Sequence, residues 1–497
     1  MKYLKVNLWG LEIGRLVWDS ATRQTYFMYN PEQKDRIPDI APLLSPAAGR
    51  NILLPIYGDE RPLYQGLPPF IADSLPDSWG NTLFDKWVKD NKIPRNKVTP
   101  LYKLMFIGTR GMGALEYEPY AADLTHTRTV DIKSLHDISL KILEDRDNTA
   151  LNTNEKLTLQ ALLAVGTSAG GRQMKAIIAI NDTTGEIRSG QTAGLEGFQY
   201  YILKFGDASM PVAEIETAYS DMALAAGIEM EECRLLSVDG INHFLTKRFD
   251  RKNGKKIYVQ TLAAINPEAR SYEDLVATCR ELSISETEIE QLFARMTFNV
   301  MTNNTDDHNK NFSFLLDGDG KWRLSPAYDV TFIFNSNGTG PNIERRLSIC
   351  GKTTDISKAD LLDFAKLNDI KNANAIINRI AEAIGKFNEY AERNGIPRPW
   401  RSIINKTLTD NLILFGYIDR RDTSEATIYD KYGRIVSDFS VSINSKGYYE
   451  VVSTIDGHRH RRFVRPNTSL YSELAELDIY NIPTDDKIRL IEISFPA

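Results

Sequence analysis

A short polar motif near residue 306 constrains the fold of this 497-residue chain more than any other feature. Asp306 stands five residues before Asn311, the spacing that a kinase catalytic loop uses for its catalytic aspartate and its magnesium-binding asparagine. Phosphoryl transfer also needs a separate carboxylate for the metal that bridges the phosphates. Asp329 follows a short strand-like run, Trp322–Leu324, and could supply that carboxylate. The spacing alone is a weak signal, but together with the strand and the aspartate it favours a kinase.

The size and composition are typical of a globular protein with several domains. The chain exceeds the roughly 250–300 residues at which a single core usually stops growing, so we expect two or three domains. Hydrophobic residues make up 42% and charged residues 25%, an ordinary balance. A net charge of −6 excludes a strong general attraction to nucleic acid or anionic lipid. Any contact with DNA would have to come from a local patch or a partner.

The cysteines and the N-terminus bear on the compartment. Cys233, Cys279 and Cys350 are scattered and form no C-x-x-C pair, which argues against a disulfide scaffold or a zinc site and suits a reducing cytosol. The N-terminus has no apolar signal segment, and no run of 18 apolar residues occurs. We therefore expect a cytoplasmic protein that does not enter a membrane.

The character of the sequence changes along the chain and predicts four units. Strand-like alternation, a proline-rich stretch and two helices, the first around Thr82–Lys89, fill residues 1–120. Residues 121–260 contain a glycine-rich loop followed by strands and a helix. Residues 261–420 are mainly helical. Residues 421–497 return to strand-like alternation and predict a small β-rich appendix.

Two glycine-rich runs differ in what they predict. Gly166–Lys175 precedes a strand at Ile177; its small residues would let backbone N–H groups approach phosphate oxygens, and Lys175 could add charge. It lacks the Walker A spacing, and a flexible surface hairpin is the alternative. Gly108–Gly113 has no clear strand before it and no acidic residue at the dinucleotide spacing, which favours a structural turn.

Lys204 is the second candidate for phosphate binding. It lies among the large apolar residues of Tyr200–Phe205, and it resembles the strand lysine that pairs the α- and β-phosphates in kinases. Such a lysine needs an acidic partner on the next helix, where both Glu214 and Glu216 are available. The alternative is a lysine on a solvated strand face.

Three further segments allow both a functional and a structural interpretation. Phe244–Arg251 predicts a strand ending in charge, either a hinge against adenine or an edge strand. His308 lies beside two aspartates, but the other five histidines are distant in sequence, which disfavours zinc. The basic run His458–Arg462 predicts a solvated hairpin or a contact with a phosphate backbone.

The glycine loop, the lysine strand, the helix, the hinge, the catalytic loop and the final aspartate follow one another as in a kinase. Over roughly residues 1–415 the chain resembles the HipA family of serine/threonine kinases, the toxins of type II toxin–antitoxin pairs. The motifs that carry the resemblance are Leu75–Gly80, Gly113–Leu115, Gly166–Gly171, Arg248–Arg251, Asp306–Ser313 and Ser325–Asp329. The resemblance implies an α+β fold: an N-terminal β-rich subdomain on a two-lobed, kinase-like body with a mostly helical C-lobe. The β-rich appendix after about residue 420 lies outside the resemblance.

The resemblance also implies a set of site residues. Asp306 would be the catalytic base, Asn311 and Asp329 would hold Mg²⁺, and Ser168 would be the site of autophosphorylation that silences the enzyme. Residues expected to contact ATP are Gly170, Gly171, Arg172, Gln173, Met174, Lys175, Lys204, Lys247, Arg248, Phe249, Gln260, His308, Asn311, Tyr328 and Asp329.

The chain departs from the family pattern at a few of these positions. Met174 replaces a proline common before the loop lysine, and Lys247 stands where the hinge usually has glutamate. The stretch Val259–Leu262 lacks the acidic residues common there.

The implied partners are a small helix-turn-helix antitoxin, DNA through that antitoxin, and a protein substrate in translation such as an aminoacyl-tRNA synthetase. Two other functions stay open. One is a catalytically silent scaffold that holds the antitoxin on DNA, which would not need Lys204, Asp306, Asn311 and Asp329 all intact. The other is a small-molecule phosphotransferase, against which the family-like N-terminal segment 1–115 argues.

Overall fold

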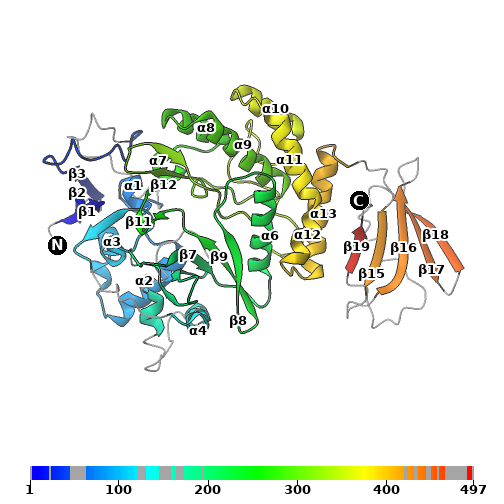
Figure 1. Cartoon of the computed structure of the whole chain (residues 1–497), viewed down its shortest axis with the longest axis horizontal. Coiled ribbons are helices and arrows are strands. Elements are labelled where there is room, and N and C mark those ends of the chain that lie inside the picture. Colours follow the sequence, from blue (N-terminus) through cyan, green and yellow to red (C-terminus); the bar gives the residue numbers. More distant parts are fainter. Residues whose placement is uncertain are drawn as a thin grey trace.

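The computed structural model describes residues 3–21, 24–44, 63–120, 130–144, 158–163, 173–191 and 194–418, together with five strand segments between 424 and 494. Helices and sheets are mixed along the chain, in agreement with the expected α+β class (Figure 1). None of the helices in these ranges has both the length and the apolarity that a membrane span requires.

An antiparallel sheet opens the chain, with strand order β3-β2-β1-β4. The alternation of Leu4, Val6 and Leu8 predicted its first strand, and these three side chains are buried. The strands are β1 (Leu4–Leu8), β2 (Leu11–Asp19), β3 (Gln24–Tyr29) and β4 (Leu115–Glu118). Between β3 and β4 lie α1 (Pro69–Ala72), α2 (Ser78–Asp90), a 3-10 turn (Arg95–Lys97) and α3 (Pro100–Ile107).

Helix α2 begins four residues earlier than the predicted Thr82. The side chain of Asp77 accepts a hydrogen bond from the backbone N–H of Gly80 at 2.5 Å and so caps the helix. Aspartate is among the strongest N-cap residues because it satisfies a backbone donor that has no partner within the helix. The prediction placed Trp79 and Gly80 in the preceding loop, whereas both belong to the first turn.

A second antiparallel sheet, with order β6-β5-β7-β9-β8, occupies the centre of the chain. Its strands are β5 (Lys175–Ile180), β6 (Ile187–Ser189), β7 (Gln199–Lys204), β8 (Cys233–Val238) and β9 (Ile241–Lys247). Two helices accompany it, α4 (Ile132–Glu144) and α6 (Val212–Ala225). In the register of β5 and β7, Lys175 lies directly opposite Lys204.

The remaining elements of the body surround the predicted catalytic loop. A short hairpin of β10 (Arg251–Lys252) and β11 (Lys255–Lys256) leads to a three-stranded sheet of β12 (Tyr258–Thr261), β13 (Ser313–Leu316) and β14 (Trp322–Leu324). Helix α7 (Leu262–Ile265) follows β12. The larger helices are α8 (Tyr272–Glu281), α9 (Glu286–Met301), α10 (Lys358–Leu367), α11 (Ala373–Gly385), α12 (Phe387–Arg393) and α13 (Arg398–Leu414).

Two hydrophobic cores hold this body together. One is built mainly from α6 and the helices after α7, including Met222, Phe293 and Ile380. The other contains residues of the N-terminal sheet, such as Leu4, together with residues of the central sheet, such as Ile178 of β5. The N-terminal sheet therefore shares a core with the central sheet. The predicted domain boundaries stay predictions.

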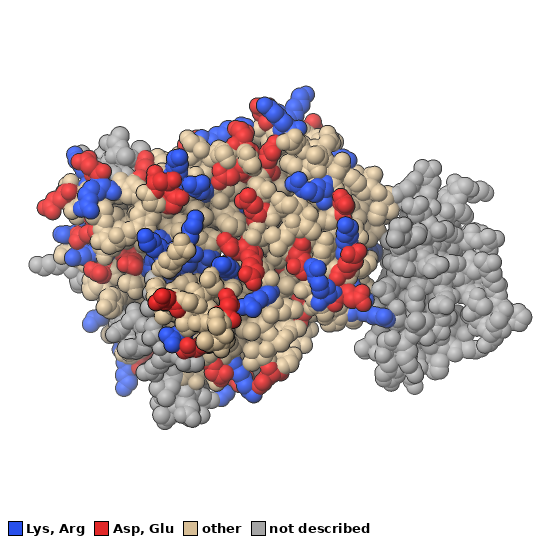
Figure 2. Space-filling model, viewed as in Figure 1, with Lys and Arg blue, Asp and Glu red and all other residues tan. Residues whose placement is uncertain are grey.

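The tail forms an antiparallel sheet of its own, with order β18-β17-β16-β15-β19, beyond α13 in Figure 1. Its strands are β15 (Ser424–Tyr429), β16 (Ile435–Ile443), β17 (Tyr449–Ile455), β18 (His458–Val464) and β19 (Leu490–Ser494). The basic run His458–Arg462 belongs to β18. On the face of the body shown in Figure 2, acidic and basic side chains are interspersed.

Candidate active site

The predicted catalytic loop lies between the end of α9 and the start of β13, and backbone contacts fix its shape. The N–H of His308 donates to the carbonyl of Asp306 at 2.9 Å, and the N–H of Asn311 donates to the carbonyl of His308 at 2.8 Å. The side-chain amide Nδ2 of Asn311 also donates to the carbonyl of Asp306, at 2.8 Å. This bond turns the amide oxygen of Asn311 away from that carbonyl, so the oxygen can serve as a ligand.

The carboxylate of Asp306 is accessible. Its side chain is 48% exposed, Nε of Arg346 lies 3.5 Å from one oxygen, and Nε2 of His308 lies 4.0 Å from the other. An accessible carboxylate beside cationic or polar groups can receive a proton from a hydroxyl that approaches from solvent.

The neighbouring Asp307 has a structural role. Its side chain is buried and accepts hydrogen bonds from the Arg345 guanidinium at 2.7 Å, the Arg346 N–H at 2.9 Å and the Tyr272 hydroxyl at 2.8 Å. These bonds attach residues 345–346 to the catalytic loop. The spacing to Asn311 had already favoured Asp306 over Asp307, and the burial of Asp307 agrees with that choice.

Lys204 joins two carboxylates from different parts of the chain. Its Nζ contacts Oε1 of Glu216 on α6 at 2.5 Å and also contacts Oδ1 of Asp329. Of the two acidic partners that the sequence offered, Glu216 therefore makes the pair, and Glu214 instead accepts a hydrogen bond from the amide of Asn242 at 2.8 Å. The arrangement matches what a phosphate-binding lysine needs, because the carboxylates hold the ammonium group in place.

The charges of this cluster shift its pKa values in different directions. Burial opposes the charge on Lys204, but Asp329 and Glu216 outweigh burial and raise the pKa of Lys204. Burial also tends to raise the pKa of Asp329, yet Lys204 and then Lys175 outweigh it and lower that pKa. For Glu216 burial prevails over the attraction of Lys204, so its pKa is raised. Asp329 is thus the carboxylate that stays ionised most readily.

Asp329 adopts a left-handed backbone conformation, with φ at +53°. Residues other than glycine rarely adopt such a φ, and these conformations cluster at functional sites. The preceding Tyr328 is anchored: its hydroxyl lies 2.6 Å from Oγ of Ser313 and donates to the carbonyl of Lys310 at 2.7 Å. Its ring lies 5.6 Å from that of Phe249.

Asn311 and Asp329 provide oxygen atoms, the donor type that Mg²⁺ prefers, and Mg²⁺ is usually held by one or two carboxylates plus phosphates and water. Both residues line one small cavity of about 20 Å³, together with Asn304 and Tyr328. The residues present therefore fit a magnesium ion bound jointly with a nucleotide. Within the described ranges, no group of three histidine, cysteine, aspartate or glutamate residues is placed to hold a metal by itself.

The predicted phosphate loop is only partly described. Ser168, Gly170, Gly171 and Arg172 lie outside the described residues. Of the three remaining predicted residues, Gln173 donates from Nε2 to the carbonyl of Phe205 at 3.0 Å, and Met174 packs against the core. Lys175 begins β5, and its Nζ lies 3.0 Å from Oδ2 of Asp77.

The predicted hinge residues differ in where their side chains go. The N–H of Lys247 donates to the carbonyl of Glu232, and Phe249 packs against Tyr328. Arg248 and Gln260 are buried, and neither side chain is open to a ligand in this structure: Arg248 binds Asp250 and the Gln260 amide donates to the carbonyl of Ile40 at 2.9 Å. Burial of these polar side chains requires internal partners, which sequence spacing does not reveal.

A buried ion cluster follows the hinge and was missed by sequence reasoning. Asp250 accepts two bonds from Arg248, at 2.8 and 2.7 Å, and one from Arg251, at 2.7 Å. It also accepts from the N–H of Gly113, at 2.8 Å, next to β4 of the N-terminal sheet. Burial would raise the pKa of Asp250, but the two arginines lower it strongly; burial lowers the pKa of Arg251 to about 10.

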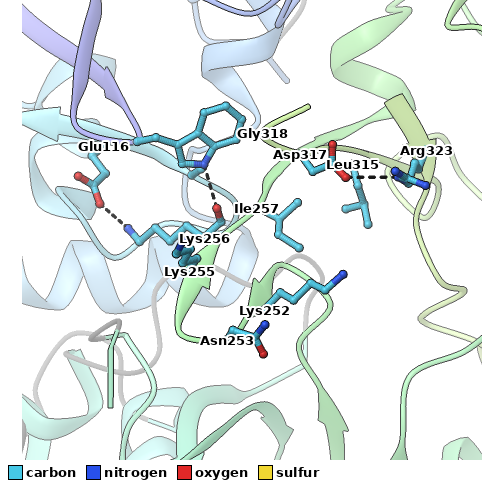
Figure 3. Close-up of a pocket in the computed structure, with 12 residues that line it drawn as sticks. Glu116, Lys252, Asn253, Lys255, Lys256, Ile257, Leu315, Asp317, Gly318 and Arg323 are labelled. Atoms are coloured by element: carbon cyan, nitrogen blue, oxygen red, sulfur yellow. Dashed lines mark hydrogen bonds and ion pairs between the residues drawn. The ribbon is translucent and has the colours of Figure 1, made fainter. Parts of the chain in front are cut away.

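A larger cavity lies elsewhere, at the junction of the N-terminal sheet with the β10–β11 and β13–β14 hairpins. It measures about 980 Å³, and its lining includes Trp9, Lys252, Lys255 and Ile257. Figure 3 shows Lys256 turned toward Glu116, and Arg323 beside Asp317. The lining of this cavity includes none of the residues expected at the active site. The candidate site is therefore located by the contacts of Lys204, Glu216 and Asp329, and not by the size of a cavity.

Family models match two parts of the chain. The model of the HipA N-terminal domain matches residues 4–118, and that of the HipA-like C-terminal domain matches residues 167–389. The comparison with curated protein sequences found no match.

Solved structures are also similar to the chain. One is HipA from the Shewanella oneidensis MR-1 toxin–antitoxin complex of HipA, HipB and operator DNA, with a TM-score of 0.56 and 16% identity over 82% of this chain and 96% of that one. At that identity the likeness shows a common fold. A weaker similarity, with a TM-score of 0.31 and 12% identity over 44% of this chain and 89% of that one, is to the Helicobacter pylori proinflammatory kinase CtkA.

Proposed function

This chain belongs to the HipA family, and from that premise we propose that it is an ATP-dependent serine/threonine protein kinase and the toxin of a type II toxin–antitoxin pair. The observation that carries the proposal is the bridge from Lys204 to Glu216 and Asp329. It joins the lysine strand, the neighbouring helix and the candidate magnesium carboxylate, the three parts that phosphoryl transfer must bring together. The central sheet would form the N-lobe and α8–α13 the C-lobe.

Each residue of the cluster has a role in this proposal. Lys204, oriented by Glu216, would contact the α- and β-phosphates. Asn311 and Asp329 would hold Mg²⁺, and bound Mg-ATP would supply the phosphoryl group with part of its charge neutralised. Asp306 would accept the proton of the substrate hydroxyl at its exposed carboxylate.

The biological context is proposed on the same premise. The Shewanella relative was solved with HipB and operator DNA. By analogy, a small helix-turn-helix antitoxin would bind this chain and connect it to DNA. The substrate would be a component of translation such as an aminoacyl-tRNA synthetase, and phosphorylation of Ser168 would silence the kinase.

Growth arrest tests whether toxicity is enzymatic. Loss of a general base typically lowers the rate about 10²–10⁴-fold, so Asp306→Asn should abolish the arrest that the wild-type chain causes when it is expressed without antitoxin. Asp319→Asn serves as the matched control, because Asp319 lies on the exposed β13–β14 hairpin and pairs with Arg323 at 3.5 Å. It should arrest growth as the wild type does. Full toxicity of Asp306→Asn, at equal expression, would contradict the kinase mechanism.

A further inference from the structure

Two lysines lie side by side at the candidate nucleotide site. Lys175 and Lys204 are directly opposite in the antiparallel register of β5 and β7, so their side chains project from the same face of the sheet. Glu216 and Asp329 pair with Lys204, and Asp77 pairs with Lys175 at 3.0 Å. Three carboxylates thus share two ammonium groups.

Asp77 comes from the N-terminal unit and is held firmly. One of its oxygens caps α2 through the N–H of Gly80, and the other meets Lys175. Two residues further on, the indole N–H of Trp79 donates to the carbonyl of Lys175 at 3.0 Å. The start of α2 therefore binds both the side chain and the main chain of the first residue of β5.

The Lys175–Asp77 pair is almost without solvent, with side chains 2% and 9% exposed. A buried ammonium group that loses a carboxylate partner is costly, so it would turn to other carboxylates within reach. Those are Asp329 and Glu216, which pair with Lys204 directly opposite Lys175, and the charge of Lys175 favours the ionised form of each.

We propose that Asp77 is a positioning residue of the nucleotide site: it holds Lys175 beside Lys204 and away from the carboxylates that Lys204 and Mg²⁺ require. The proposal rests on the proposed kinase function. Without the charge of Asp77, Lys175 would pair with Asp329 and compete with the metal. The N-terminal unit would thus complete the site that the C-terminal unit carries.

Two substitutions remove the charge and keep the helix cap. Asparagine and serine both cap helices well, so Asp77→Asn and Asp77→Ser should preserve α2. Both are made in the full chain with Asp306→Asn, so that no phosphate is transferred, and Mg-ATP binding is measured by calorimetry. We expect the Kd to rise about tenfold or more, as when a group that orients a metal ligand is lost. Asp90→Asn is the control, because Asp90 pairs with Lys86 on the same helix at the surface; its Kd should not change.

A double-mutant cycle with Lys175→Met separates positioning from a general structural effect. If Asp77 acts through Lys175, adding Asp77→Asn to Lys175→Met should weaken Mg-ATP binding no further, and Asp77→Glu should restore part of the affinity. Unfolding midpoints without ligand confirm that the variants are folded. Unchanged or tighter binding by both Asp77 variants, or a full effect in the Lys175→Met background, would overturn the inference alone. Failure of the Asp306→Asn parent to bind Mg-ATP would overturn the proposed function as well.

Discussion

At the scale of single residues, burial and contacts distinguish similar side chains at the candidate site. Asp306 and Asp307 are adjacent, yet one carboxylate is exposed and the other is enclosed by Arg345 and Tyr272. Glu214 and Glu216 lie on the same helix, yet only Glu216 reaches Lys204. Residue type alone would not have distinguished the members of either pair.

The pair of glutamates offers a matched test. Glu216→Gln keeps the shape of the side chain but removes the charge that orients Lys204, so we expect a higher KM for ATP and a kcat/KM about 10- to 100-fold lower. Glu214→Gln should leave both constants near wild type, because the carboxylate of Glu214 accepts a hydrogen bond from the Asn242 amide, which a glutamine oxygen can also accept. Steady-state kinetics at varied ATP concentration measure the difference. Equal effects of the two substitutions would exclude a special role for Glu216.

At the scale of elements, α4 packs against the end of the central sheet through an aromatic cluster. His136 on α4 stacks on Phe205 at 5.4 Å and lies 5.2 Å from His243 of β9. The ring nitrogen Nδ1 of His243 accepts a hydrogen bond from the N–H of Gly206 at 3.0 Å. Burial, and then the proximity of His136, lowers the pKa of His243 from 6.5 to about 4.

This shift predicts a loss of stability in mild acid. The unfolded chain takes up a proton on His243 below about pH 6.5, whereas the folded chain does so only near pH 4. The stabilising contribution is therefore complete above pH 6.5 and is lost as the pH falls toward 4. Urea titrations at pH 7 and pH 5 measure how much the unfolding free energy falls between the two. That fall should be smaller in His243→Asn, whose side chain can still accept a hydrogen bond from the N–H of Gly206 but does not titrate. An equal fall in the variant and the wild type would show that other groups control the acid sensitivity.

At the scale of the whole molecule, the N-terminal and C-terminal family domains are one packed body. A hydrophobic core runs from the N-terminal sheet into the central sheet, and two polar contacts reinforce it. One is Asp77 with Lys175, and the other is Asp250 with the N–H of Gly113. We therefore expect the two family domains to unfold together.

Asp250→Asn tests that expectation. It leaves Arg248 and Arg251 buried without their shared carboxylate, which should cost about 3–5 kcal/mol of unfolding free energy. Asp239→Asn is the control, because Asp239 and Lys133 form a pair in which both side chains are more than half exposed, and such pairs contribute little. Denaturant unfolding followed by two probes, one in each domain, measures both the loss and its cooperativity. Separate transitions for the two domains would contradict the single packed body.

The sequence predicted the local features well and the long-range ones poorly. Alternating apolar residues predicted the strand at Leu4–Leu8, and motif order singled out Asn311 and Asp329, which line one small cavity. The links Asp77–Lys175 and Gly113–Asp250 join residues 98 and 137 positions apart, so no local spacing predicts them. The start of α2 was missed because Trp79 and Gly80, which follow the cap residue Asp77 within three positions, were assigned to the preceding loop.

The most direct test of the kinase proposal is the intact mass of the purified chain after incubation with Mg-ATP. Wild type, Asp306→Asn and Ser168→Ala are compared, each first shown to be unmodified. We expect one added phosphate on wild type and none on either variant, which would establish phosphoryl transfer and place it on Ser168. No added phosphate on unmodified wild type would contradict self-phosphorylation and favour a silent scaffold.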